Sequence, residues 1–223
     1  MTRSLYVTLV VIWLGFALAA SSRAEEPAAV EWVPFVATWV EQDEFQKLQV
    51  PFTLHLSGIY VRDKRGSWFR RATASPIRGG LLAITVYADT AILCDRVNHT
   101  FYSLNFMRKT IKPLQVDATS EPLFGDNPIS PQAFEQHHSQ DKFLGKRTIS
   151  GVECEGYAND DSRHEGKHVS EAWYAPSLNY LVIEGKSRLQ DGREVTTRVE
   201  EIRAGKEPNP KYFRLPKGFK MIK

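Results

Sequence analysis

The fold is indicated most clearly by residues 52–74, which read FTLHLSGIYVRDKRGSWFRRATA. Phe52, Leu54 and Leu56 recur at every second position, which is typical of a strand that buries one face. The letters DKRG at residues 63–66 have the chemistry of a hairpin turn, because glycine adopts a positive φ without strain. A returning strand follows the turn, so the stretch predicts an antiparallel β-hairpin.

The same pattern extends over most of the remaining chain. Phe35, Ala37 and Trp39 share one face of a predicted strand, and Asp191-Gly192 is a strong hairpin signal. Besides residues 52–61, the predicted strands are residues 35–42, 67–74, 81–87, 90–97, 100–106, 148–157, 168–175, 180–189 and 194–203. Strands at this spacing, joined by short turns, predict a mainly β (α+β) fold built on a meandering antiparallel sheet. Pro208 and Pro210 are expected to end it.

A proline-rich stretch divides the predicted strands into two groups. Residues 113–131 contain four prolines and several turn-forming residues, which predicts a long irregular connection. Ser130-Pro131 then favours a helix start, with serine as the cap and proline in the first turn. We expect this helix to run to about Phe143, with Phe134 and Phe143 as its apolar anchors. The sequence shows no internal repeat, so we expect two halves of one sheet rather than two domains.

The N-terminal segment has the features of a secretion signal. Arg3 precedes an apolar run of 16 residues from Leu5 to Ala20, and the segment 22–24 supplies small residues for a signal peptidase. The alternative is a retained membrane anchor, but this run is shorter than the ~20 residues that a spanning helix needs. We therefore predict a cleaved signal peptide over residues 1–24 and a single soluble β-rich domain over residues 25–223, periplasmic or secreted.

The net charge of the predicted mature chain does not favour a nucleic-acid partner. Residues 25–223 have 27 basic and 26 acidic side chains, whereas nucleic-acid binding usually needs a strongly basic face. Two local basic clusters exist: Arg62, Lys64, Arg65, Arg70, Arg71 and Arg78, and Lys206, Lys211, Arg214, Lys217, Lys220 and Lys223. We interpret them as solvated strand faces and a solvated tail, with contact to anionic lipid head groups as the alternative.

The two cysteines, Cys94 and Cys154, would enter an oxidising compartment together. A disulfide between them would close a loop of about 60 residues and could stabilise the fold by about 4 kcal/mol. It requires that the two strands be neighbours with facing Cβ atoms, and two buried thiols are the alternative. Neither cysteine belongs to a CxxC pair, so a redox-catalytic role is not expected.

One motif has the spacing of a catalytic metal site. Residues 164–168 read HEGKH, and in zinc peptidases a helix presents both histidines of H-E-x-x-H to the metal. Here turn-forming residues 159–162 precede the motif and a strand pattern follows it, which argues against a helix. We interpret the motif as a solvated loop, and a zinc-dependent hydrolase with His164 and His168 as metal ligands is the alternative.

A second pair of histidines lies on the predicted helix. His137 and His138 are adjacent, so their side chains point to different sides of a helix and a shared metal is not expected. We interpret them as part of a polar helix face. The sequence contains no nucleophile motif, phosphate loop or dinucleotide fingerprint, so we assign no catalytic residue and expect neither a cofactor nor enzymatic activity.

Three segments in the second half of the chain resemble passages of a known group of proteins. These are FLGKRTISGVECEG at 143–156, EAWYAPSL at 171–178 and EPNPKYFRLPKGF at 207–219. The group consists of exported, largely uncharacterised bacterial proteins, which are similar in turn to the LolA-like superfamily of outer-membrane lipoprotein carriers and sorting proteins. The resemblance covers roughly residues 35–220. It implies an open half-barrel made of a curved antiparallel sheet, with one short helix in or near the hollow.

Aromatic residues crowd the first half of the chain. Their ordinary role is to fill a core, and the functional alternative is to line a concave apolar surface. The candidate ligand-binding residues are Phe35, Trp39, Phe52, Leu54, Tyr60 and Trp68. We therefore predict a non-catalytic exported binding or carrier protein of the cell envelope. Its ligand would be a lipid or lipoprotein acyl chain, another apolar molecule or a cell-envelope protein; a structural envelope protein without a ligand is a further alternative.

Overall fold

The structure, a computed structural model, describes residues 31–45, 52–74, 89–114, 131–161, 168–188 and 193–222, which belong to one compact unit, Glu31–Lys223. The strands are β1 (Phe35–Phe45), β2 (Phe52–Arg62), β3 (Trp68–Ala74), β4 (Asp89–Asp95), β5 (Thr100–Asn105), β6 (Thr110–Leu114), β7 (Lys142–Ile149), β8 (Val152–Asp161), β9 (His168–Ala175), β10 (Leu181–Arg188), β11 (Glu194–Ala204) and β12 (Lys220–Met221). One α-helix, α1 (Pro131–His137), and two short 3-10 helices, η2 (Pro176–Leu178) and η3 (Pro210–Phe213), complete the described elements.

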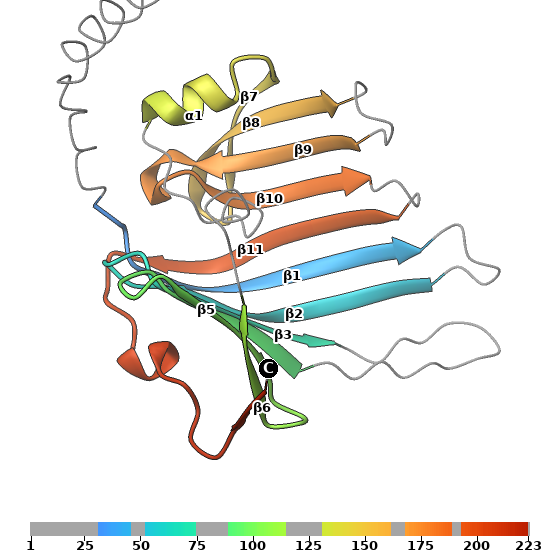
Figure 1. Ribbon diagram of the computed structural model, residues 1–223. Coiled ribbons are helices and arrows are strands. Elements are labelled where there is room, and N and C mark those ends of the chain that lie inside the picture. Colours follow the sequence, from blue (N-terminus) through green and yellow to red (C-terminus); the bar gives the residue numbers. More distant parts are fainter. Residues whose placement is uncertain are drawn as a thin grey trace, which may run out of the picture. The chain divides into compact units, whose positions relative to one another are not determined.

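All twelve strands form a single sheet in the order β12-β6-β5-β4-β3-β2-β1-β11-β10-β9-β8-β7 (Figure 1). Strands β1–β6 form one meander and β7–β11 form another, and antiparallel pairing of β1 with β11 joins the two. The edge strands β12 and β7 do not pair with each other, so the sheet stays open. The predicted mainly β fold, an open curved sheet with one short helix, is confirmed.

The hairpin of β2 and β3 has the predicted turn. The amide of Gly66 donates a 3.0 Å hydrogen bond to the carbonyl oxygen of Asp63, and Gly66 has a φ of +83°. The Trp32 ring covers this turn so closely that a Cβ on Gly66 would lie 2.4 Å from it. Glycine is therefore needed at this position both for its backbone conformation and for its missing side chain.

The connection between the two meanders differs from the prediction in two places. Helix α1 ends at His137 and not near Phe143, and Phe143 belongs to β7 with 51% of its surface exposed. The predicted single strand over residues 148–157 is also wrong, because a tight turn at Ser150-Gly151 divides it between β7 and β8. Both turn residues have a positive φ, 51° and 80°, as a two-residue hairpin loop requires.

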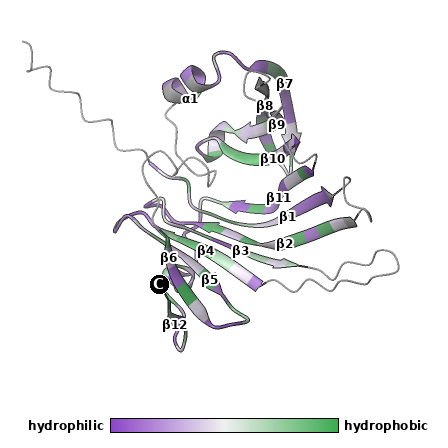
Figure 2. Ribbon diagram, turned by 45° about the vertical axis from the view of Figure 1, so that its right-hand side comes forward, coloured by the Kyte–Doolittle hydropathy of each residue, from purple (hydrophilic) through white to green (hydrophobic). Residues whose placement is uncertain are grey.

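The C-terminal segment covers the face of the sheet that carries Val61, Phe69 and Leu93. Tyr212, Phe213, Leu215 and Phe219 of this segment pack against the buried apolar cluster on that face. The sheet does not end at Pro210, however, because Lys220–Met221 adds the edge strand β12 in parallel to β6 (Figure 2). Strand β6 was not predicted either. Its Pro113 lies beyond the two residues that pair with β12, where a missing amide is tolerated.

Some predictions fall outside the described residues. They are the signal peptide, the strand at 81–87, the turn at 191–192 and most of the proline-rich connection. Among the helices that the structure describes, none has the length and apolar character required to span a bilayer.

Candidate functional site on the concave sheet face

Strand register places Trp39, Tyr60 and Trp68 of the first three strands on one face. Trp39 stands opposite Gly58 on β2 and Val199 on β11, and Tyr60 stands opposite Arg70 on β3. Along this face the rings form a chain of edge-to-face contacts: Phe35–Tyr60 at 5.0 Å, Tyr60–Trp68 at 6.3 Å and Trp68–Phe101 at 6.4 Å between centroids. Edge-to-face pairs of this kind are favourable beyond their buried area. The rings therefore pack against one another as a core.

Trp39 is held in place by three neighbours. Its indole N–H donates a 3.0 Å hydrogen bond to the carbonyl oxygen of Arg71, and the guanidinium carbon of Arg70 lies 3.8 Å from its ring centroid. Gly58 makes room for the indole, because a Cβ at this position would lie 3.2 Å from the indole nitrogen. The indole is thus buried, oriented and stacked beneath a cation, which is a favourable arrangement for a tryptophan.

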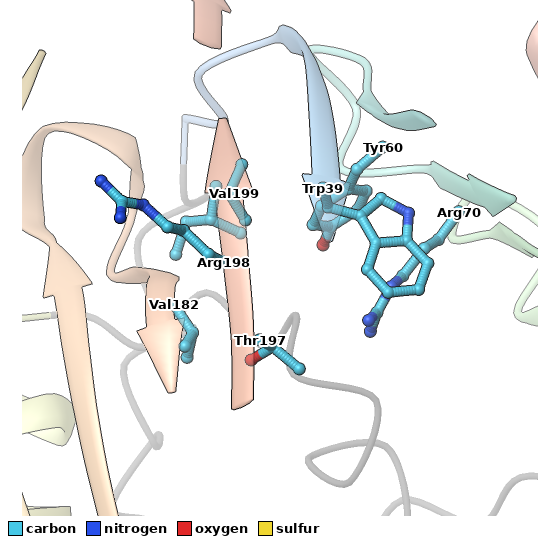
Figure 3. A pocket seen from close by; sticks show the side chains of 8 residues that line it. Trp39, Tyr60, Arg70, Val182, Thr197, Arg198 and Val199 are labelled. Carbon is cyan, nitrogen blue, oxygen red and sulfur yellow. The ribbon is translucent and has the colours of Figure 1, made fainter. Parts of the chain in front are cut away.

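A hollow of about 70 Å³ lies beside Trp39 (Figure 3). Its lining comes from five strands: Trp39, Tyr60, Arg70, Leu181, Val182, Thr197, Arg198 and Val199. Strands β3 and β10 are separated by four strand spacings in the sheet, which is about 19 Å in a flat sheet. Both can line one small hollow only because the sheet bends around it. The face that carries Trp39 is therefore the concave face.

Charged side chains flank the hollow. Arg70 Nη2 lies 3.3 Å from Glu41 Oε2, and Arg193 Nη1 lies 3.5 Å from Asp43 Oδ2 further along β1. Burial raises the pKa of both carboxyl groups above their ordinary values, and the adjacent guanidinium groups counteract this in part. Burial also lowers the pKa of Arg70, which Glu41 partly offsets. The hollow therefore has an apolar wall, and the partly buried Arg70–Glu41 ion pair lies beside it.

The predicted ligand-binding residues are only partly brought together here. Phe35, Trp39, Tyr60 and Trp68 belong to one buried cluster, but only Trp39 and Tyr60 line the hollow. Leu54 lies on β2 opposite Asp43 and is half-buried, and the side chain of Phe52 is outside the described residues. Sequence reasoning missed the residues that β3, β10 and β11 contribute: Arg70, Leu181, Val182, Thr197, Arg198 and Val199.

The interpretation of the first basic cluster as a solvated face is wrong for Arg62. This side chain is 1% exposed, and its guanidinium donates to the carbonyl oxygens of Val33 and Leu178 and to Asn179 Oδ1. It also lies 4.9 Å from the Trp32 ring centroid. Burial, with a smaller effect of Arg96, lowers the pKa of Arg62 to about 9. Arg70 and Arg71 are partly buried and ion-paired, and Arg78 lies outside the described residues.

The interpretation of the helix histidines as a polar face is wrong for His138. Its Nδ1 lies 2.6 Å from Asp141 Oδ2, and its ring packs between Phe134 and Tyr174 at 4.4 and 4.9 Å. Phe134 is 1% exposed and stacks on Tyr180 at 4.0 Å. Phe134 also meets Tyr157 and Tyr174 edge to face, so α1 covers this part of β8 and β9. The side chain of His137 is outside the described residues.

Both cysteines are buried and belong to the cluster that contains Trp39, and the disulfide between them stays a prediction. Cys94 lies on β4 and Cys154 on β8, and six other strands separate β4 from β8 in the sheet. Burial raises the pKa of the Cys154 thiol, which makes it a poor nucleophile.

The HEGKH motif falls at the junction between β8 and β9 in the sequence. His164 to Lys167 are outside the described residues, whereas His168 begins β9 and stands opposite Asp161 of β8. The segments on both sides of the motif are therefore extended strands. His168, which the zinc alternative needs on a helix, belongs to one of them. Within the described ranges, no group of three histidine, cysteine or acidic side chains is arranged to hold a metal ion.

The chain matches no family model and no curated protein. Among solved structures it is similar to MucB, with a TM-score of 0.45 and 11% identity over 86% of this chain. It spans only 60% of the MucB chain. It is also similar to LprF from Mycobacterium bovis, with a TM-score of 0.38 and 15% identity over 80% of this chain and 90% of that one.

A third similar structure is a putative outer membrane lipoprotein-sorting protein domain from Vibrio parahaemolyticus. Its TM-score is 0.23 and its identity 11%, over 82% of this chain and 90% of that one.

Proposed function

We propose that this chain is a non-catalytic binding protein of the cell envelope, which takes the apolar end of a lipid-like ligand at the concave hollow beside Trp39. The observation that supports this most is the lining itself. One hollow on the inside of the curve gathers two aromatic and three aliphatic side chains from four strands, with Arg70 and Arg198 as its charged neighbours. Such a combination of apolar wall and few polar groups is typical of small-molecule sites.

The size of the hollow limits how much of a ligand it can accommodate. At about 70 Å³ it is far below the ~300–1,000 Å³ of most ligand pockets, so it accommodates only the end of a chain. Arg70 is the side chain whose movement enlarges it, because its guanidinium covers the Trp39 ring while remaining 35% exposed. When Arg70 turns towards solvent, the face of Trp39 becomes part of the lining. Binding is thus coupled to the breaking of the Arg70–Glu41 ion pair.

The sequence supports the same function independently. The predicted secretion signal directs the protein out of the cytoplasm, and the resemblance is to exported proteins related to lipoprotein carriers. Catalysis is not proposed, because the groups around the hollow lack the paired nucleophile and base that covalent catalysis requires.

The direct test is to purify the exported protein without detergent and to analyse an organic extract by mass spectrometry. We expect a lipid or another amphiphile in an amount comparable to the protein. Titration of the delipidated protein with a brominated fatty acid should quench tryptophan fluorescence in a saturable way, since Trp39 lines the site. A protein that yields no extractable lipid and shows no saturable quenching would contradict the proposal.

A further inference from the structure

The charged side chains at the edge of the sheet around β6 and β12 are all basic. Residues 105–114 and 208–222 contain no aspartate or glutamate. The first segment contributes exposed Arg108, Lys109 and Lys112. The second contributes exposed Lys211, Arg214, Lys217 and Lys220. We call this surface the basic edge. The rest of residues 25–223 then has 20 basic against 26 acidic side chains, so the charge of the chain is strongly asymmetric.

Backbone contacts fix the two segments side by side. The amide of Lys220 donates a 2.8 Å hydrogen bond to the carbonyl oxygen of Lys109, and the amide of Ile222 donates one of 2.8 Å to Ile111. The rings of Phe106 and Phe219 meet at 5.4 Å. Figure 2 shows β12 next to β6 at this end of the sheet. The cations are therefore gathered by the fold and not only by the sequence.

Large apolar side chains are exposed among these cations. Met107 is 59% exposed in the turn before Arg108, and Met221 and Ile222 are 50% and 39% exposed directly after Lys220. They account for three of the five large apolar side chains that are exposed in the described part of the chain. Exposed apolar residues surrounded by lysine and arginine are typical of surfaces that enter the interface of an anionic membrane.

A second hollow, of about 330 Å³, opens beside the basic edge under the C-terminal segment. Its floor includes Phe69, Leu104 and Phe106, whereas Lys211, Arg214 and Lys217 stand around it. An apolar floor with a cationic rim is complementary to a lipid, whose acyl chain is apolar and whose head group is anionic. Its volume is within the range of common ligand sites, unlike that of the hollow beside Trp39.

We propose that the basic edge docks this protein on an anionic lipid bilayer. Lys109, Lys217 and Lys220 contact head groups, and Met107, Met221 and Ile222 insert among them. The acidic remainder of the chain is repelled by the same membrane, which orients the molecule with the basic edge towards it. A nucleic acid fits the surface less well, because the described edge exposes methionine and isoleucine rather than aromatic rings on which bases stack.

The test is co-sedimentation of the purified exported protein with vesicles. We expect binding to vesicles of phosphatidylglycerol and phosphatidylcholine, decreasing as salt rises from 50 to 500 mM, and little binding to pure phosphatidylcholine. The triple variant K109Q/K217Q/K220Q should bind roughly 100-fold more weakly, at about a fivefold loss for each charge. M107S/M221S should weaken binding at high salt more than at low salt, because the apolar contribution is not screened.

The matched control is K64Q/R65Q/K142Q, which removes three exposed charges elsewhere and should bind like the wild type. Equal binding of the wild type to both kinds of vesicle, or equal loss in the two triple variants, would overturn the proposal. So would tight binding to soluble polyglutamate without binding to vesicles, which would identify an acidic protein surface as the partner. These readouts do not involve the hollow beside Trp39, so they remain interpretable whether or not that hollow binds a ligand.

Discussion

The guanidinium of Arg62 donates a 2.8 Å hydrogen bond to the carbonyl oxygen of Leu178, 116 positions further along the chain. This contact links β2 of the first meander to η2 of the second, at a point buried from solvent. Asn179 takes part as well: its Oδ1 accepts from both Arg62 Nη2 and the amide of Val33. A buried cation thus joins the two halves of the fold through acceptors that cannot be ionised.

Replacing Arg62 with methionine should destabilise the protein by about 2–4 kcal/mol, because several buried acceptors lose their donor at once. Urea unfolding followed by circular dichroism measures this difference. R62K should rescue little, since one ammonium cannot span the acceptors that the guanidinium reaches. R65M alters an exposed arginine of the adjacent turn and should change stability by less than about 0.5 kcal/mol. Equal stability of R62M and R65M would contradict this role.

The packing of helix α1 against the sheet should depend mainly on the side chain of Phe134. Phe134 is 1% exposed and contacts three tyrosines, so F134A should cost about 3 kcal/mol at this site. Hydrogen exchange should then show faster exchange for the amides of residues 134–138, with little change in β1–β3. E135A removes the exposed neighbour and should leave exchange unchanged. Unaltered protection in F134A would mean that this packing does not hold the helix.

The phenol of Tyr174 provides a prediction at alkaline pH. Burial, together with Asp141 and Tyr157, raises the pKa of Tyr174 to about 12 from an ordinary value of 10. Because the folded state keeps this proton while the unfolded state loses it, the associated stability is complete below pH 10 and is lost as pH rises to 12. The loss should reach about 2 kcal/mol. Between pH 10 and pH 12, the free energy of unfolding should fall less steeply for Y174F than for the wild type. An identical fall in the two proteins would contradict the raised pKa of Tyr174.

Most strands of the sheet could be predicted from the sequence because strand periodicity and turn chemistry are local signals. The DKRG turn is confirmed, since glycine at residue 66 and the carbonyl of Asp63 act within one hairpin. The turn at Ser150-Gly151 was missed because its two residues lie inside a continuous β-like pattern, and only their positive φ separates the strands. Helix α1 ends at His137, and the contact of His138 with Asp141 that follows it could not be read from the sequence pattern.

The residues that line the hollow beside Trp39 could be predicted only in part, because the curvature of the sheet brings them together. Trp39 and Tyr60 were identified by their aromatic character, which is visible in sequence. Val182 and Thr197 are ordinary strand residues, and nothing local distinguishes them from other residues of β10 and β11. They reach the hollow because the sheet bends, which brings β10 towards β3. Arg62 was misjudged for a similar reason: its partners are backbone carbonyls of a distant 3-10 helix, which sequence patterns do not reveal.

Two adjacent threonines of β11 allow a matched test of whether the hollow beside Trp39 receives an apolar ligand. Thr197 lines this hollow, whereas Thr196 is exposed on the opposite face of the sheet. The direct measurement is the affinity of a fluorescent fatty acid for T197F and T196F, with unfolding curves to verify that both are folded. We predict that T197F fills the hollow and weakens binding at least tenfold, while T196F binds like the wild type. Equal affinity of the two variants, or a loss confined to T196F, would contradict the account.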